Sequence, residues 1–241
     1  MVLETQNRQK KIVEMFNDIA PTYDKANRVL SMGVDIQWRK RACDETFSRY
    51  NKPIDLIVDV ACGTGDMMGY WQKQAKKRDI EVGKILGVDP SRGMVEVAKK
   101  KFSEFEFVIS EATKIPLEDE SADILSISYG IRNVVRREEA FREFARVVKQ
   151  GGYVVILEFT KDEKKEGLLY SIKDFYMNKI LPTLGGIISK NKEAYEYLPN
   201  SIEGFLTSEM LSSELRDAGF ESEFVKSFSM DISTLVIAKK I

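Results

Sequence analysis

Short apolar runs alternate with amphipathic segments through the middle of the chain. The runs are interpreted as buried strands and lie at 56–60, 84–89, 105–109, 122–128 and 153–158. The segments between them have apolar positions at helical spacing and lie at 67–77, 90–101 and 137–148. Gly151-Gly152 is expected to end the last helix. Five alternations predict a doubly wound, mostly parallel α/β sheet with ligands at the carboxyl ends of its strands.

The segments on either side of this region complete the prediction. Residues 1–50 are expected to be helical, with a break at Ala20-Pro21 and a second helix over 37–50. The aromatic-rich stretch 161–205 predicts a helical lid, and a helix over 207–218 has Thr207 as its N-cap. A closing hairpin of 220–228 and 232–238 brings the strand total to seven. We expect one domain over 1–241, with a helical cap (1–50), a cofactor-binding core (51–160), the lid (161–205) and a C-terminal helix and hairpin (206–241).

Composition narrows the chemistry because the 241 residues include no histidine. Histidine is the commonest general base and metal ligand, so Ser-His-Asp triads, Cys-His pairs and histidine zinc sites are excluded. Two cysteines, Cys43 and Cys62, are too few for a four-thiolate metal site. The chemistry must therefore use carboxylates, Tyr, Lys, Arg or a reactive cofactor, and no bound metal is expected.

Charge and hydropathy bear on the partners. A net charge of −1 argues against nucleic acid, because nucleic-acid binders usually have a basic excess. No apolar run approaches the roughly 18 residues of a membrane span. The charged N-terminus lacks the apolar stretch of a signal peptide, and the cysteines look unpaired, so we expect a cytoplasmic protein.

A glycine loop follows the first predicted strand, in the segment Asp59-Val60-Ala61-Cys62-Gly63-Thr64-Gly65-Asp66. Its two glycines allow a tight turn and close approach to a ligand. The third glycine of a dinucleotide fingerprint is replaced by Met68, and Asp66 would repel phosphate at the helix start. Either this is an ordinary tight turn, or it is a site for a nucleotide-like ligand without phosphates.

Asp89 ends the second predicted strand, 24 residues after Gly65. A carboxylate there bonds ribose hydroxyls in doubly wound folds, although a lone strand-end Asp is also a common helix N-cap. Together, the loop and Asp89 favour a nucleoside site. S-adenosylmethionine fits as a phosphate-free nucleoside whose cationic sulfonium suits Asp59 and Asp66. The segments 110–113 and 126–129 end the third and fourth strands, where adenine and methionine contacts would lie.

With these residues identified, the chain resembles the class I methyltransferases and, among them, the C-methyltransferases of menaquinone and ubiquinone biosynthesis. The similarity spans about Val13 to Ala238. Three stretches carry it: Phe16–Asp24 continuing to Asn27, Leu30-Ser31 and Trp38; Ile127–Val134; and Arg146–Lys149 with Gly151-Gly152 and Leu157-Glu158-Phe159. Ile127–Val134 and the Tyr23-Asp24 stretch are the most specific to this family.

The resemblance implies S-adenosylmethionine-dependent C-methylation of a polyprenyl quinol, either demethylmenaquinol or a 2-methoxy-6-polyprenyl-benzoquinol. It places cofactor contacts at Thr64, Asp89, Glu111, Ala112 and Ser128, with Gly63 and Gly65 supplying backbone around them. Four positions depart from the usual family residues: Asp35 replaces histidine, Gln150 replaces proline, Thr160 replaces serine, and Glu111 replaces Asn or Asp.

Methylation of a quinol carbon requires removal of a ring hydroxyl proton, and a phenol has a pKa of about 10. Arg132 could stabilise the resulting phenolate or orient a water that takes the proton. Asn133 could hold the ring oxygen, Tyr23 could orient the ring or the sulfonium, and a buried Asp35 could be the base. Structural alternatives stay open: a surface ion pair for Arg132, a core position for Tyr23 and a helix start for Asp35.

The substrate tail requires an apolar channel, and the segment 168–198 is the natural place for it. Its apolar positions could equally form a helix that packs on the core; they are Leu168, Leu169, Tyr170, Ile172, Phe175, Tyr176, Met177, Ile180, Leu181, Leu184, Ile187 and Ile188. A lipid-soluble substrate leads us to expect a peripheral membrane contact, and a homodimer stays open. Another class I O- or N-methyltransferase and a non-catalytic nucleoside-binding protein are the alternative functions.

Overall fold

The computed structural model describes residues 2–161, 171, 174–189, 191–229 and 231–241 of the chain. Within these residues, seven strands form one sheet in the order β3-β2-β1-β4-β5-β7-β6. Five strands are mutually parallel: β1 (Ile54–Val60), β2 (Val82–Val88), β3 (Glu106–Val108), β4 (Ala122–Ser128) and β5 (Val148–Glu158). Strand β7 (Ser233–Lys240) runs antiparallel to β5 and to β6 (Phe220–Phe228). The predicted fold class and closing hairpin are confirmed.

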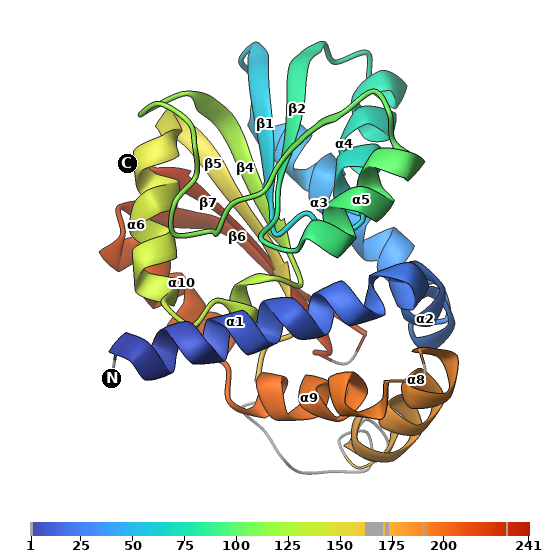
Figure 1. Cartoon of the computed structure of the whole chain (residues 1–241). Helices are drawn as coiled ribbons and strands as arrows, with labels where there is room; N and C mark the ends of the chain where they lie inside the picture. The colour runs from blue at the N-terminus through green and yellow to red at the C-terminus, as the bar shows by residue number, and fades with distance from the viewer. Residues whose placement is uncertain (1, 162–170, 172–173, 190, 230) are drawn as a thin grey trace.

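Helices cover both faces of this sheet, because its central strands are apolar on both sides (Figure 1). On one face lie α3 (Val34–Arg49) and α4 (Asp66–Lys77), where Phe47 packs edge-to-face on the fully buried Trp71. On the other lie α6 (Arg137–Val147) and α10 (Ser208–Asp217), with Phe141 and Phe144 in the core. Helix α5 (Arg92–Lys101) contacts β3 and begins at the N-cap Ser91.

Two helical segments far apart in sequence meet at the carboxyl ends of the parallel strands (Figure 1). The first, named here the N-terminal arm, consists of α1 (Val2–Ile19), the 3₁₀ turn η1 (Ala20–Thr22) and α2 (Tyr23–Leu30). The second consists of the π-helical turn η3 (Tyr176–Ile180), α8 (Leu181–Ser189) and α9 (Lys192–Glu203). They share a third apolar cluster that includes Ile19, Leu30 and Met177. No helix among the described residues is long and apolar enough to span a membrane.

Several predicted boundaries were wrong for local reasons. Strand β5 begins at Val148, not at residue 153, because the glycine pair forms a bulge inside the strand instead of ending the helix. Gly151 has a φ of +74°, and a Cβ on Gly152 would lie 2.8 Å from the Asp123 carbonyl oxygen. Strand β3 is shorter than 105–109. Helix α2 lies in the stretch expected to be helical, although its bounds were not predicted, and α3 begins at Val34, not at residue 37, after Gly33, whose φ is +78°. Thr207 is the N-cap of α10, as predicted.

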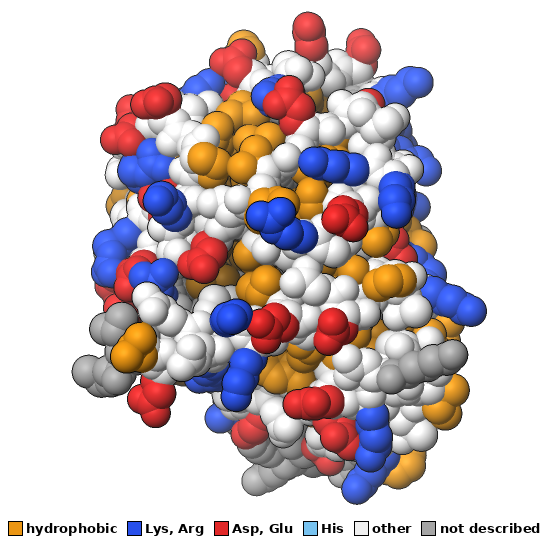
Figure 2. Space-filling model, viewed as in Figure 1, with side chains coloured by type: hydrophobic (Ala, Val, Ile, Leu, Met, Phe, Trp, Pro, Cys, Tyr) orange, Lys and Arg blue, Asp and Glu red, His pale blue; other side chains and the backbone are white. Residues whose placement is uncertain are grey.

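The distribution of charged side chains on the surface agrees with the nearly equal numbers of basic and acidic residues in the sequence. On the face shown in Figure 2, Lys and Arg side chains are interspersed with Asp and Glu. Both cysteines are free and buried. Among the described residues, no group of three or more His, Cys, Asp or Glu side chains is arranged to hold a metal ion.

Candidate active site

The glycine loop joins β1 to α4 and is held by the carboxylate that ends β2. The backbone N–H groups of Gly63 and Ser91 donate to the two oxygens of Asp89, each at 2.8 Å. Gly63 has a φ of +55° and open space where a Cβ would point. Burial raises the pKa of Asp89 to about 6, although both hydrogen bonds favour the charged form. Asp89 therefore shapes the loop while facing a cavity.

The end of β4 approaches this loop unusually closely. A Cβ on Gly130 would lie 2.6 Å from the Ala61 side chain, so only glycine fits there. Ala61 and Tyr129 both have positive φ, +49° and +59°, which are strained values for residues other than glycine. The Oγ of Ser128 is buried without a partner among the described residues. Strained backbone and an unsatisfied hydroxyl at one cavity indicate a ligand site.

A first cavity lies between these loops and α1. Helix α1 is fastened at both sides of it: Gln9 bonds the backbone of Asn133 and Val135, and the Asn17 carboxamide accepts from Ser91 and Gly93. Ile12, Val13 and Phe16 close the cavity from above. Helix α1 is therefore a wall of the site, not a peripheral extension.

Five of the eight predicted cofactor residues line this cavity, namely Gly63, Asp89, Glu111, Ala112 and Ser128. The pattern fits S-adenosylmethionine: open space at Gly63 for close approach, an unpaired hydroxyl at Ser128, and carboxylates at Asp89 and Glu111 that accept from hydroxyl or amine donors. Arg136 also lines the cavity, but its guanidinium already contacts Glu111 and Glu139. These observations favour a nucleoside without phosphates.

The other three predicted cofactor residues lie outside the cavity lining. Asp59 is buried and accepts from Ser126 at 2.6 Å, and burial raises its pKa to about 7. Thr64 donates to Asp24 at 2.5 Å. Gly65, with a φ of +83°, packs against Phe102. The contacts of these three residues are with other parts of the protein, so they hold the glycine loop in position.

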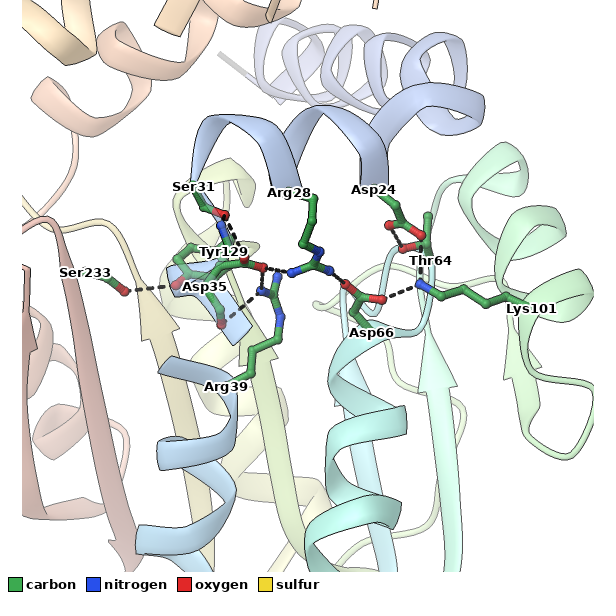
Figure 3. Close-up of polar contacts among 11 residues, drawn as sticks. Asp24, Arg28, Ser31, Asp35, Arg39, Thr64, Asp66, Lys101, Tyr129 and Ser233 are labelled. Atoms are coloured by element: carbon green, nitrogen blue, oxygen red, sulfur yellow. Dashed lines mark hydrogen bonds and ion pairs between the residues drawn. The ribbon is translucent and has the colours of Figure 1, made fainter. Parts of the chain in front are cut away.

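A chain of ion pairs joins the N-terminal arm to the glycine loop (Figure 3). Lys101 pairs with both Asp24 and Asp66, and Arg28 bonds Asp66 at 2.5 Å. Arg28 also bonds Asp35, which is shared with Arg39. Burial would raise the pKa of Asp66, but Lys101, Arg39 and Arg28 hold it below its usual range. This ionic chain, from Lys101 to Arg39, runs from the loop to a second cavity.

The second cavity, of about 390 Å³, lies between α2, α3, η3 and α9. Most of its lining is apolar, including Met15, Phe16, Ile19, Leu30, Met32, Trp38, Phe159, Met177, Leu181 and Leu198. Phe16, Tyr23 and Tyr129 line both cavities. Burial raises the pKa of Tyr23, so its hydroxyl stays protonated at neutral pH. Molecules in the two cavities would meet beside these three residues.

Arg132 and Asn133, in the 3₁₀ turn η2 (Ile131–Asn133), stand near this junction. Arg132 lines the second cavity, and its Nη1 donates to Glu158 at 2.5 Å and to the Tyr129 carbonyl at 2.9 Å. Nη2 has no protein acceptor within the described part of the chain. Asn133 lines the first cavity and accepts from Tyr197 at 3.0 Å. The fully buried Glu158 thus fixes Arg132 while leaving it donors for a ligand.

Asp35 lines the second cavity, and its carboxylate is already occupied. It accepts from Arg28 and Arg39 and, at 2.6 Å, from Ser31 (Figure 3). These three donors engage both of its carboxylate oxygens. Its observed partners favour a positioning role.

The predicted tail channel is only partly in the described structure. Leu168, Leu169, Tyr170 and Ile172 lie outside the described residues. Tyr176, Met177 and Leu181 line the second cavity, whereas Phe175, Leu184 and Ile187 are exposed. Ile180 and Ile188 do not belong to the cavity lining. Further along the same segment, Ala194, Tyr195, Tyr197 and Leu198 also line this cavity, and the arm and α3 contribute a similar share of its apolar lining.

Sequence reasoning missed Arg39, Gln9 and Asn17. Arg39 belongs to the Trp38-Arg39 pair in a helix whose periodicity shows no clear apolar face, so its burial had no local signal. Gln9 and Asn17 act across more than 70 residues of sequence, where spacing carries no information. The one signal in the sequence for a role of α1 in the site was its apolar side, which bears Ile12, Val13 and Phe16.

A sheet of this order, with a phosphate-free nucleoside cavity at the carboxyl ends of β1, β2 and β4, defines a class I S-adenosylmethionine-dependent methyltransferase. Solved methyltransferases share the fold. A geranyl diphosphate C-methyltransferase from Streptomyces coelicolor aligns with a TM-score of 0.57 at 11% identity, over 83% of this chain and 78% of that one. A putative methyltransferase from Methanococcus maripaludis aligns with a TM-score of 0.60 at 20% identity, over 92% and 91%.

The chain belongs to the ubiE/COQ5 methyltransferase family, which it matches over residues 4–240. The ubiquinone/menaquinone biosynthesis C-methyltransferase UbiE of Campylobacter jejuni is 58% identical over 97% of this chain and 99% of that protein. The demethylmenaquinone methyltransferase of Chlorobaculum tepidum is 33% identical over 99% and 96%. The family, the cofactor and the enzyme class predicted from the sequence, an S-adenosylmethionine-dependent C-methyltransferase, are confirmed.

Asp89 provides a pH test of the cofactor site. Its ionised carboxylate is the better acceptor for ribose hydroxyls, so affinity for S-adenosylmethionine should fall as the pH drops through about 6. Asp89→Asn should bind about tenfold more weakly at pH 8 and lose this dependence. Calorimetric titration between pH 5 and 8 measures both effects. Equal affinities, or the same pH dependence in the variant, would remove Asp89 from cofactor binding.

Proposed function

We propose that this enzyme methylates a ring carbon of a polyprenyl quinol, as the names of its relatives suggest for menaquinone or ubiquinone biosynthesis. The observation that carries the proposal is the junction at Tyr23 and Tyr129, where a nucleoside cavity meets a large apolar cavity that contains a guanidinium group. An apolar cavity suits the prenyl tail and aromatic ring, and Arg132 suits a ring oxygen.

The chemistry divides between cofactor and protein. Bound S-adenosylmethionine supplies an electrophilic methyl group. Arg132 stabilises negative charge on the ring oxygen beside the reacting carbon, which raises the electron density of that carbon. Arg132 does not itself take the proton, because guanidinium stays protonated in proteins. Tyr23, which lines both cavities, orients the ring, and the arm excludes water from the junction. Asn133 lines the nucleoside cavity and accepts from Tyr197, so its contact with the ring stays a prediction.

Glu158 and Asp35 have supporting roles in this mechanism. Glu158 accepts from Arg132 and from the Phe159 N–H, so it sets the direction of the guanidinium. Burial raises the pKa of Glu158, although Arg132 favours its charged form. Asp35, bonded to two arginines, holds Arg28 and Arg39 instead of removing the substrate proton. The proton acceptor is then a water held near Arg132.

One assay tests the function. The enzyme is incubated anaerobically with methyl-¹³C S-adenosylmethionine and, in separate reactions, with demethylmenaquinol and a 2-methoxy-6-polyprenyl-benzoquinol. We expect a ¹³C methyl resonance on a ring carbon of one or both quinols. A label on oxygen only would favour the O-methyltransferase alternative. Cofactor binding without turnover of either quinol would favour a non-catalytic binding protein.

Replacement of Arg132 tests the mechanism. Arg132→Ala should lower kcat about 10²- to 10³-fold at pH 7 and leave affinity for S-adenosylmethionine within about twofold. The loss should shrink toward pH 10, where the quinol ionises without help. The exposed Arg142→Ala on α6 is the matched control. Full activity of Arg132→Ala, or an equal loss at every pH, would refute phenolate stabilisation.

A membrane contact is the natural route for a lipid-soluble substrate. Helices α2 and α8 are in contact, and exposed apolar side chains occur from α2 to the start of α3 and on α8; this set, named here the rim, is Val29, Met32, Val34, Leu184 and Ile187. Met32 is 81% and Ile187 70% exposed, and Met32 and Val34 also line the second cavity. We propose that this rim docks reversibly on a lipid surface, in a cytoplasmic enzyme whose thiols stay reduced. The homodimer left open by the sequence stays a prediction.

The rim can be tested by its effect on two substrates. Met32→Glu combined with Ile187→Glu should raise the KM for a long-chain quinol in vesicles about tenfold, because charged residues oppose insertion into lipid. The KM for a short-chain, water-soluble quinol should change less than about twofold. Val225→Glu on β6, 47% exposed in the parent, is the control. An equal change for both substrates would place the effect inside the cavity and reject membrane docking.

A further inference from the structure

Arg39 is a buried cation in the second cavity that the mechanism above does not use. It is 6% exposed, lines the cavity, and has a guanidinium carbon 5.2 Å from the centre of the Tyr129 ring. Nη1 bonds Asp35, but Nε has no partner within the described part of the chain. A buried charged donor without an acceptor is costly, so a ligand oxygen is its natural partner.

The charge on Arg39 is only partly balanced. Its carboxylate partner, Asp35, is shared with Arg28 and also accepts from Ser31 (Figure 3). Burial favours the neutral form, yet Tyr129 and Asp35 raise the pKa of Arg39 above its ordinary value. Arg39 therefore remains a cation, with a donor to spare, in a largely apolar cavity.

The position of Arg39 relative to Arg132 suggests which oxygen it meets. Both guanidinium groups contact Tyr129: Arg39 faces its ring, and Arg132 donates to its carbonyl oxygen at 2.9 Å. Both cations also act electrostatically on Tyr23, the residue at the junction. Two guanidinium groups that line one cavity and contact the same tyrosine match a ligand with two oxygens on one ring.

We propose that Arg39 binds the second hydroxyl of a 1,4-quinol, the one that is not adjacent to the reacting carbon. This proposal rests on the proposed function. Only the adjacent oxygen, assigned to Arg132, donates electron density to the reacting carbon; the second oxygen contributes binding. Arg39 is thus a specificity-determining residue that selects 1,4-dihydroxy rings over monohydroxy rings, because its unpaired donor penalises a ligand without that oxygen.

The test compares two ligands that differ in this hydroxyl. One is 2-prenyl-1,4-dihydroxynaphthalene, and the other is 3-prenyl-1-naphthol, which keeps the hydroxyl beside the reacting carbon. Dissociation constants are measured anaerobically with S-adenosylhomocysteine bound. The wild type should prefer the diol about tenfold or more. Arg39→Lys keeps the charge beside Asp35 but removes the Nε donor, and its preference should fall to within about threefold.

Two further variants make the result decisive. Arg41→Lys on the same helix, where Arg41 is half-exposed and paired with Glu45, should keep the wild-type preference. Tyr195→Phe removes the Tyr195 hydroxyl, a fully buried polar atom of this lining that also has no partner in the described part of the chain, and should keep the preference as well. Loss of the preference in Tyr195→Phe but not in Arg39→Lys would overturn the assignment, as would an unchanged preference in Arg39→Lys.

Failure of the proposed function gives a different result. If the wild type methylates neither quinol in the ¹³C assay, the proposed function fails whatever the binding ratios are. If the wild type methylates a quinol carbon and binds diol and monohydroxy ligands equally, only the role of Arg39 fails. A shift in the pH dependence of kcat in Arg39→Lys, with the diol preference intact, would place Arg39 on the reactive oxygen and also reject the proposal.

Discussion

The ionic chain between α2 and the glycine loop is the interaction on which the site depends. The N-terminal arm contributes side chains to both cavities, yet it lies outside the sheet and its two cores. Lys101, Asp66 and Arg28 tie it to the first turn of α4, and Asp24 bonds Thr64 inside the loop. These groups are partly buried, so screening by solvent is reduced and each charge has a partner. Without this connection, both cavities would lose a wall.

This arrangement explains how the junction of the two cavities can serve two dissimilar ligands, a nucleoside and an apolar substrate. The strained turns at Ala61 and Tyr129, which Gly130 allows to pack closely, bring the loop after β1 against the end of β4. In the proposed function, the nucleoside would lie on the loop side and the apolar substrate on the side of α3 and α9. Among the described residues, Phe16, Tyr23 and Tyr129 are the ones that belong to both linings. Alignment at this junction, with water excluded by the arm, supplies much of what transfer of an already activated methyl group requires. A chain without histidine is adequate for such a reaction.

The sequence predicted what local patterns determine. Apolar runs identified the parallel strands, and the glycine loop and Asp89, predicted to hold the cofactor, do line a cavity. Prediction from the sequence failed where a residue's contacts are with residues far away in the chain. At the Gly151-Gly152 bulge, Gly152 lies so close to the Asp123 carbonyl oxygen that a Cβ would clash with it, and Asp59 bonds Ser126 and is not part of the cavity lining. The sequence predicted a base or a helix start at Asp35 and gave no sign of its partners Arg28 and Arg39. Arg39 itself had no signal, because its burial comes from the packing of α3 beneath the arm.

Hydrogen exchange with Arg28→Met tests most directly whether the ionic chain holds the arm in place. In this variant Asp66 is still paired with Lys101, and Asp35 is still paired with Arg39, so no carboxylate loses all its partners and the sheet should stay folded. The account predicts that α2 amides exchange at least about tenfold faster, that α6 and α10 are unchanged, and that S-adenosylhomocysteine restores part of the protection. The exposed Arg142→Met is the control. Wild-type exchange throughout α2 in Arg28→Met would contradict the account.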